Sequence, residues 1–128
     1  MPRRLVQHII MIKTILAILS IDGCLSDNKT ERSWILHPDV YGIDALYDAC
    51  GDALVEADVT NLSYIKELFA QEQVERMIVY TVPFLSGGNS HLFSDDMPPL
   101  YWTLESSQLY RGGVVCTVYK RSTIGESD

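Results

Sequence analysis

Two carboxylates, Glu56 and Asp58, follow the short apolar run 53–55, which has strand character. Ligands collect at the carboxyl ends of strands in α/β sheets, so the two residues could form a catalytic pair. A carboxylate in this position more often caps the next helix. Asp58 is well placed to accept hydrogen bonds from the N–H groups near Thr60 and Asn61. Both interpretations stay open from the residues alone.

A second candidate is the glycine pair Gly87-Gly88, which follows the apolar segment Val74–Val82. A buried strand that feeds a glycine loop can deliver the loop to a binding cleft, although such a loop is more often a plain turn. The strand itself is predicted to be covered on both sides, because alternate residues on either face are largely apolar. One face holds Met77, Val79 and Thr81, and the other holds Ile78, Tyr80 and Val82.

The cysteines and histidines show no ligand spacing. There are three of each, Cys24, Cys50 and Cys116 and His8, His37 and His91. An odd number of distant cysteines without a C-x-x-C pair signals neither a disulfide framework nor a zinc site. The sequence therefore predicts no metal, reduced thiols and a cytoplasmic protein.

Length and charge exclude several classes of protein. A chain of 128 residues predicts one domain with a real core. The net charge of −7, with only ten scattered basic residues, argues against a nucleic-acid partner. We predict a possible N-terminal extension at 1–10, a single domain at 11–121 and a polar tail at 122–128. The apolar stretch after Arg4 is interrupted by polar residues, so it predicts neither a signal peptide nor a membrane span.

The order of elements predicts a mixed sheet with helices packed on it. A strand over Thr14–Ile21 leads through a polar loop at Ser26–Arg32 to a helix that starts at His37-Pro38-Asp39 and stops at Gly51. The other predicted elements are a strand at 53–55, a helix at Thr60–Gln73, the strand Val74–Val82, and strands Leu100–Leu109 and Val114–Tyr119 joined at Arg111-Gly112-Gly113. Helical crossovers imply parallel strands at the front, and the closing hairpin implies antiparallel strands at the back.

A series of short motifs resembles one family. Ser20-Ile21-Asp22-Gly23, Ser33-Trp34-Ile35, Leu54-Val55-Glu56, Leu85-Ser86-Gly87-Gly88 and Leu92-Phe93 stand in the order found in the reductase domain of bacterial riboflavin biosynthesis. That domain is related in fold to dihydrofolate reductase. The resemblance covers roughly Met11 to Lys120 and implies an α/β fold with a mixed, mostly parallel sheet.

The resemblance also implies a reaction and a set of site residues. The family uses NADPH to reduce the ribose of a phosphoribosyl-aminopyrimidine. By motif match, Trp34 and the segment 58–64, with Asp58, Thr60 and Asn61, would lie along the cofactor, and Glu56 would hold substrate hydroxyls. A helix start near Thr60 would offer N–H groups to a phosphate.

The sequence departs from the family pattern at that site. Ala57 and Asp58 replace two glycines, so a carboxylate stands where a pyrophosphate would sit. Cys24 replaces a basic residue, Ile18 a small one, and Asp48 another basic one. A middle block of strands and helices that the family pattern contains has no counterpart in this sequence, which predicts an internally shortened fold.

These departures leave alternatives open. One is a non-catalytic remnant of the fold that acts as a structural or binding module. Another is a small module that binds a ligand or protein through Tyr101, Trp102 and Tyr110, although aromatic residues at strand spacing usually belong to the core or a sheet face. A shortened sheet leaves an edge uncovered, which predicts a homodimer.

Overall fold

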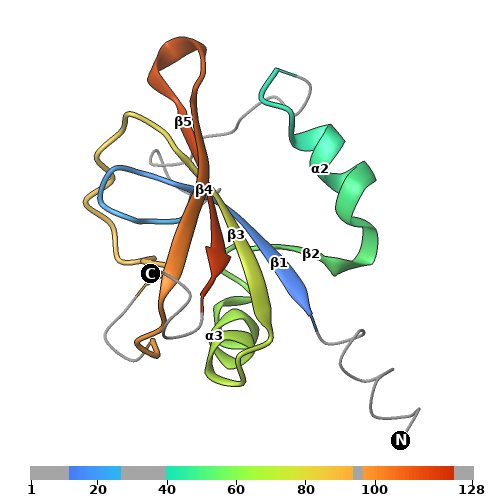
Figure 1. Cartoon of the computed structure of the whole chain (residues 1–128). Helices are drawn as coiled ribbons and strands as arrows, with labels where there is room; N and C mark the ends of the chain where they lie inside the picture. Colours follow the sequence, from blue (N-terminus) through green and yellow to red (C-terminus); the bar gives the residue numbers. More distant parts are fainter. Residues whose placement is uncertain (1–11, 27–39, 94–96, 123–128) are drawn as a thin grey trace, which may run out of the picture.

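A computed structural model describes residues 12–26, 40–93 and 97–122. Within these described ranges, five strands form one sheet in the order β2-β1-β3-β5-β4, with two α-helices packed beside it (Figure 1). The elements are β1 (Lys13–Leu19), α2 (Ile43–Cys50), the 3-10 turn η1 (Gly51–Ala53), β2 (Leu54–Glu56), α3 (Leu62–Ala70), β3 (Val74–Thr81), β4 (Trp102–Leu109), the 3-10 turn η2 (Arg111–Gly113) and β5 (Val115–Arg121).

Strand pairing matches the predicted direction of each connection. β1 pairs in parallel with β2 and with β3, and β5 pairs antiparallel with β3 and with β4. The predicted order of strands and helices and the mixed α/β sheet are therefore confirmed. Two of the four pairings are parallel and two are antiparallel. Among the described residues, no helix is long and apolar enough to cross a membrane.

The sheet buries both faces of its central strands. On the α3 side, Met77 and Val79 of β3 pack with Ile65 of α3 in one apolar cluster. On the α2 side, Ile78 and Tyr80 pack with Ile43 of α2 in a second cluster. The helices lie on opposite faces because the crossover from β1 to β2 and the crossover from β2 to β3 run in opposite directions across the sheet and both must be right-handed. The prediction that this strand is covered on both sides is confirmed.

The start of the first helix was predicted too early. Val40 is a turn residue that is 53% exposed, and α2 begins at Ile43 after Gly42, whose φ of 75° is left-handed. The predicted helix included Val40 and was wrong at that position, whereas the stop at Gly51 is confirmed. The proposed start at 37–39 and most of the loop at 26–32 lie outside the described residues, as does the extension at 1–10.

The closing hairpin forms where it was predicted. Gly112 and Gly113 have φ values of 81° and 82°, which side chains disfavour, and the Tyr110 N–H donates to the Val114 carbonyl at 2.7 Å. β4 is an edge strand whose residues after Trp102 are all exposed. Ser122, the first residue of the predicted tail, is buried and donates its N–H to the Tyr101 carbonyl at 2.9 Å. The backbone hydrogen bonding between β5 and β4 therefore extends one residue beyond β5.

Candidate functional site

The order of the parallel strands singles out one edge of the sheet. From β1 the chain crosses to β2 on one side and then returns past β1 to β3 on the other side. The carboxyl ends of β1 and β3 are therefore neighbours at a point where the strand order reverses. Open α/β sheets bind ligands in the crevice outside such a point. The loops that follow β1 and β3 form the candidate site.

Asp22 joins these two loops. Its carboxylate accepts the Ser20 hydroxyl at 2.5 Å and the backbone N–H groups of Ser86 at 3.1 Å and Gly87 at 2.9 Å. Gly87 has a φ of 67°, a left-handed conformation that turns its N–H toward the carboxylate. The hydrogen bond from Ser20, followed by those from Ser86 and Gly87, holds the pKa of Asp22 well below its ordinary value. The glycine turn therefore already binds an anionic group of the chain itself.

The same loops lie side by side beyond Asp22 (Figure 1). The Leu25 N–H donates to the Ser90 carbonyl at 2.8 Å, and the Leu92 N–H donates to the Gly23 carbonyl at 3.1 Å. Between these bonds, Cys24 and His91 form an isolated antiparallel bridge. Cys24 is 1% exposed, and its thiol points to an Asp22 oxygen at 3.8 Å. The pairing thus brings together residues that are 67 positions apart in the sequence.

The predicted site at the end of β2 is held by hydrogen bonds of its own. Asp58 accepts the Thr60 N–H at 2.6 Å and the Thr60 hydroxyl at 2.5 Å. Asn61 accepts the Asp58 N–H at 2.9 Å and donates its amide to the Glu56 carbonyl at 2.9 Å. The hydroxyl and N–H of Thr60 lower the pKa of Asp58. Asp58 thus accepts the hydrogen bond predicted from Thr60 and shapes the turn before α3. It does not cap the helix, because α3 begins at Leu62 with Asn61 as its N-cap and has no side-chain cap hydrogen bond.

Glu56 is turned toward the first helix. It accepts a short hydrogen bond from the Tyr47 hydroxyl of α2. Partial burial, and then this hydrogen bond, raise the pKa of Tyr47 to about 12. The structure brings together the predicted residues Glu56, Asp58, Thr60 and Asn61, but their described side-chain hydrogen bonds are with one another and with Tyr47. Trp34, the remaining predicted cofactor residue, lies outside the described residues.

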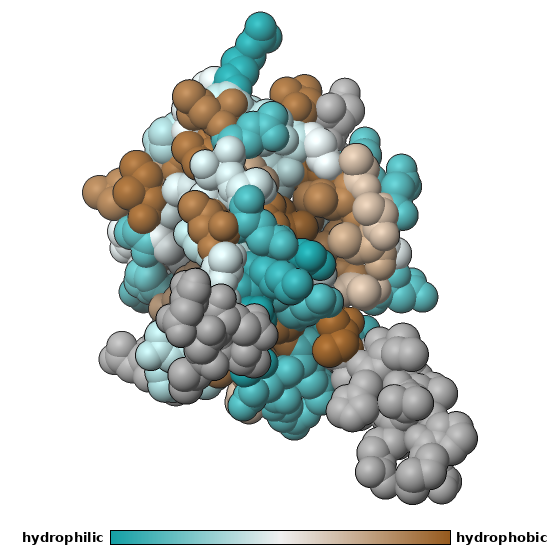
Figure 2. Space-filling model, viewed as in Figure 1, coloured by the Kyte–Doolittle hydropathy of each residue, from teal (hydrophilic) through white to brown (hydrophobic). Residues whose placement is uncertain are grey.

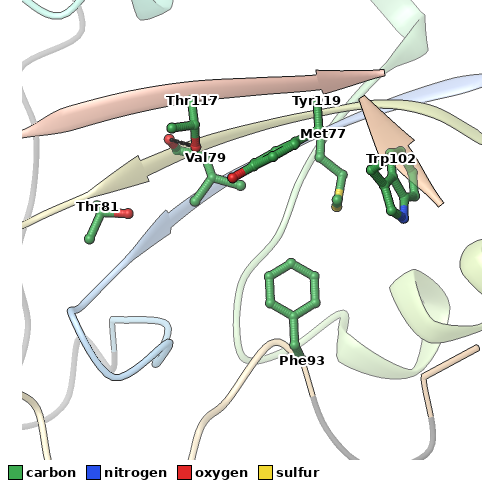
Figure 3. A pocket seen from close by; sticks show the side chains of 7 residues that line it. All are labelled: Met77, Val79, Thr81, Phe93, Trp102, Thr117 and Tyr119. Carbon is green, nitrogen blue, oxygen red and sulfur yellow. Dashed lines mark hydrogen bonds between the residues drawn. The ribbon is translucent and has the colours of Figure 1, made fainter. Parts of the chain in front are cut away.

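An apolar pocket opens on the α3 face of the sheet, over β3, β5 and β4. Its volume is about 400 Å³, and Phe93 lies across it from the sheet (Figure 3). The hydroxyls of Thr81 and Tyr119 are among its few polar groups. Its lining residues are Met77, Val79, Thr81, Phe93, Trp102, Thr117 and Tyr119. A mainly apolar pocket of this size with a few polar groups is typical of small-molecule sites.

The predicted aromatic binding residues divide between core and surface. Trp102 packs edge-on against Phe69 of α3, with ring centroids 6.0 Å apart. Tyr110 packs against Tyr80 at 6.1 Å on the other face. Tyr101 is 64% exposed. Only Trp102 of the three lines the pocket, so the interpretation of these residues as one exposed binding surface is wrong.

Three residues of these sites were not predicted from the sequence, namely Asp22, His91 and Phe93. Asp22 and Phe93 were noted only as parts of motifs, and His91 carried no spacing signal. The available signal was positional, since Asp22-Gly23 and Gly87-Gly88 each follow a buried strand. That these two glycine turns lie next to each other follows only from the strand order, in which β1 and β3 are neighbours.

Similarity to solved structures shows the fold class, because the chain has the dihydrofolate-reductase-like α/β fold. One similar structure, a protein assigned to riboflavin biosynthesis from Shewanella sp. PV-4, has a TM-score of 0.56 at 13% identity over 88% of this chain and 99% of that one. Dihydrofolate reductase from Enterococcus faecalis, complexed with NADP(H), has a TM-score of 0.53 at 10% identity, over 88% of this chain and 98% of that one.

RibD from Acinetobacter baumannii gives a TM-score of 0.55 at 10% identity, covering 88% of this chain and 58% of that protein. Neither a family model nor a curated protein sequence matches the chain. The likeness therefore establishes the fold, in agreement with the resemblance noted from the motifs.

Proposed function

We propose that this chain is a binding module that retains a reductase fold and takes a planar, uncharged heterocycle without NADPH-dependent reduction. The main support for the proposal is that Asp22 accepts the N–H groups of the glycine turn at Ser86 and Gly87. Backbone N–H groups at the carboxyl edge of a sheet are the groups that bind phosphates in α/β folds. Here the Ser86 and Gly87 N–H groups donate to Asp22, and the Thr60 N–H donates to Asp58.

Charge at the edge supports the same proposal. The pKa values of Asp22 and Asp58 are both lowered, so both carboxylates are charged at neutral pH. A nucleotide phosphate would have to displace or approach these anions, and like-charge contacts are costly when water is excluded. The net charge of −7 adds a repulsive background. An uncharged ring is not subject to this electrostatic repulsion.

The pocket over β3 and β5 is the proposed ring site. Phe93 stands across from Tyr119 and Trp102, so a flat ring can contact aromatic side chains from two sides (Figure 3). The hydroxyls of Thr81 and Tyr119 offer hydrogen bonds to ring nitrogens or carbonyls. These features favour a pyrimidine-type or pterin-type ring.

Phe93→Ala is expected to weaken binding of a fluorescent pterin about 2- to 10-fold, because one aromatic contact contributes about 0.5–1.5 kcal/mol. Pterin fluorescence, quenched on stacking, measures the affinity. Phe84→Ala is the matched control, because Phe84 is 39% exposed against 44% for Phe93 and does not line the pocket. Equal weakening in both variants, or no pterin binding by the wild type, would refute the ring site.

An NADPH-dependent reductase of the riboflavin-biosynthesis type is the second candidate. It is favoured by the fold that the chain shares with a dihydrofolate reductase complexed with NADP(H). In that case Trp34, Asp58, Thr60 and Asn61 would contact the cofactor, and Glu56 the pyrimidine-type substrate. Oxidation of NADPH in the presence of a pyrimidine or pterin, above the rate without protein, would establish this candidate and exclude the non-catalytic one.

The proposal includes a homodimer formed through the β4 edge. This edge strand exposes Leu104 (54%) and Leu109 (74%), and exposed strand edges commonly pair with another chain. In the view of Figure 2, hydrophobic residues form separate patches among hydrophilic ones.

A cytoplasmic location is also part of the proposal, since none of the three cysteines forms a disulfide.

Replacing Leu104 and Leu109 together by glutamate is expected to convert the dimer to a monomer, because charge on an edge strand opposes strand pairing. Light scattering should give about twice 14.4 kDa for the wild type and 14.4 kDa for the variant. Leu85→Glu is the control, since Leu85 is 69% exposed but lies outside β4. A monomeric wild type would contradict the dimer.

A further inference from the structure

Three potential metal ligands converge where the loops after β1 and β3 meet. One carboxylate oxygen of Asp22, the Cys24 sulfur and one ring nitrogen of His91 all lie within 4.8 Å of one another. We propose that these residues bind one zinc-class divalent cation, with water in the fourth position. The inference does not depend on the proposed ring binding.

The backbone holds two of the ligands in register. Cys24 and His91 are bridge partners, flanked by the 2.8 Å bond from Leu25 to Ser90 and the 3.1 Å bond from Leu92 to Gly23. Residues directly opposite one another on adjacent extended segments carry their side chains on the same side. The convergence of sulfur and nitrogen is thus built into the pairing of the two loops.

The required movement is small. Zinc bonds of about 2.0–2.3 Å place tetrahedral ligand atoms roughly 3.3–3.8 Å apart. The separation between ligand atoms, now up to 4.8 Å, must therefore shrink by about 1–1.5 Å. His91 is exposed, so its imidazole can rotate toward the other two ligands, whereas Cys24 is buried and fixed.

Asp22 already accepts hydrogen bonds of the kind that hold a metal-binding carboxylate in a fixed orientation. Ser20, Ser86 and Gly87 donate to its carboxylate and fix its direction. Hydrogen bonds of this kind orient ligands in metal sites and tune their affinity. Oδ1 accepts from Ser20 and Ser86, whereas Oδ2 accepts from Gly87 and from the Cys24 thiol. The thiol proton leaves on metal binding, so Oδ2 keeps a lone pair for the metal.

The environment of Cys24 suits a cation. Its thiol faces two acceptors, the Asp22 oxygen at 3.8 Å and the Gly88 carbonyl at 3.6 Å. On metal binding the thiol proton leaves to solvent, a sulfur–metal bond forms, and the Asp22 carboxylate and Cys24 thiolate together neutralise the charge of +2. Sulfur and imidazole ligands select zinc or cobalt over magnesium or calcium.

Cobalt(II) titration of the purified full chain tests the proposal, since thiolate coordination gives an intense sulfur-to-cobalt charge-transfer band. The wild type should develop this band with one equivalent of cobalt and lose it when zinc is added. Cys24→Ser should abolish the band, and His91→Ala should weaken cobalt binding at least about tenfold. Cys50→Ser is the control, because Cys50 is outside the cluster and should leave the band unchanged.

The His91→Ala variant keeps the test decisive if Cys24→Ser fails to fold, because the His91 side chain is exposed. Circular dichroism establishes that each variant is folded. The proposal is overturned if folded wild type gives no charge-transfer band, if His91→Ala binds cobalt as tightly as the wild type, or if Cys50→Ser removes the band.

Discussion

Ile65→Ala should lower the free energy of unfolding by about 2–5 kcal/mol, the largest effect that we expect from a single substitution. Ile65 is completely buried and is the residue of α3 that lies deepest in the cluster on its face of the sheet. Truncation removes its apolar contacts and leaves a cavity that neighbouring side chains fill only in part. The nine-residue helix α3 depends on this packing, because isolated helices of that length are marginal in water.

Urea unfolding followed by circular dichroism measures this effect. The adjacent Tyr64→Ala is the matched control, because Tyr64 lies on the same turn of α3 and is 49% exposed. It should change the free energy of unfolding by less than about 1 kcal/mol. Similar losses for both variants would mean that α3 does not pack on the sheet as described.

Asp22→Asn should be the second most damaging change. The amide keeps the size of the side chain but loses the charge that strengthens the hydrogen bonds from Ser20, Ser86 and Gly87. The variant should melt several degrees lower at neutral pH. It should also make the glycine turn more open to proteolysis, because Asp22 ties that turn to the end of β1.

The pH dependence of this effect has a defined sign. The pKa of Asp22 is lowered in the folded chain from its ordinary value of 3.8. The stabilisation by its charged form is therefore fully present above about pH 4 and is lost as the pH falls further toward the folded pKa. The difference in melting temperature between wild type and Asp22→Asn should be constant from neutral pH down to about 4 and shrink below it. Asp52→Asn, at an exposed aspartate of η1, should show no such profile.

Much of the fold was predictable from local patterns. The apolar residues on both faces of β3 predicted a strand buried on both sides, and the paired glycines after Arg111 predicted the hairpin. The start of α2 was not predictable from spacing, because Val40 fits the helical repeat while Gly42 takes a left-handed conformation that ends the preceding turn. The predicted internal shortening of the fold stays a prediction.

The candidate site was less accessible to sequence reasoning. The hydrogen bond from the Thr60 N–H to Asp58 followed from local chemistry, since donor and acceptor are two residues apart. The contacts of Asp22 with Ser86 and Gly87 span more than sixty residues and depend on which strands are neighbours. The bridge between Cys24 and His91 has the same origin, and for that reason separate counts of cysteines and histidines indicated no metal site.

The central claim is that carboxylates of the chain occupy the N–H groups that a nucleotide phosphate would need. Titration of the wild type with NADPH, followed by cofactor fluorescence and by melting temperature, tests it most directly. We predict no saturable binding up to ~1 mM NADPH, the upper end of ordinary enzyme affinities, in a preparation that binds pterin. Saturable NADPH binding at micromolar concentration would contradict the account.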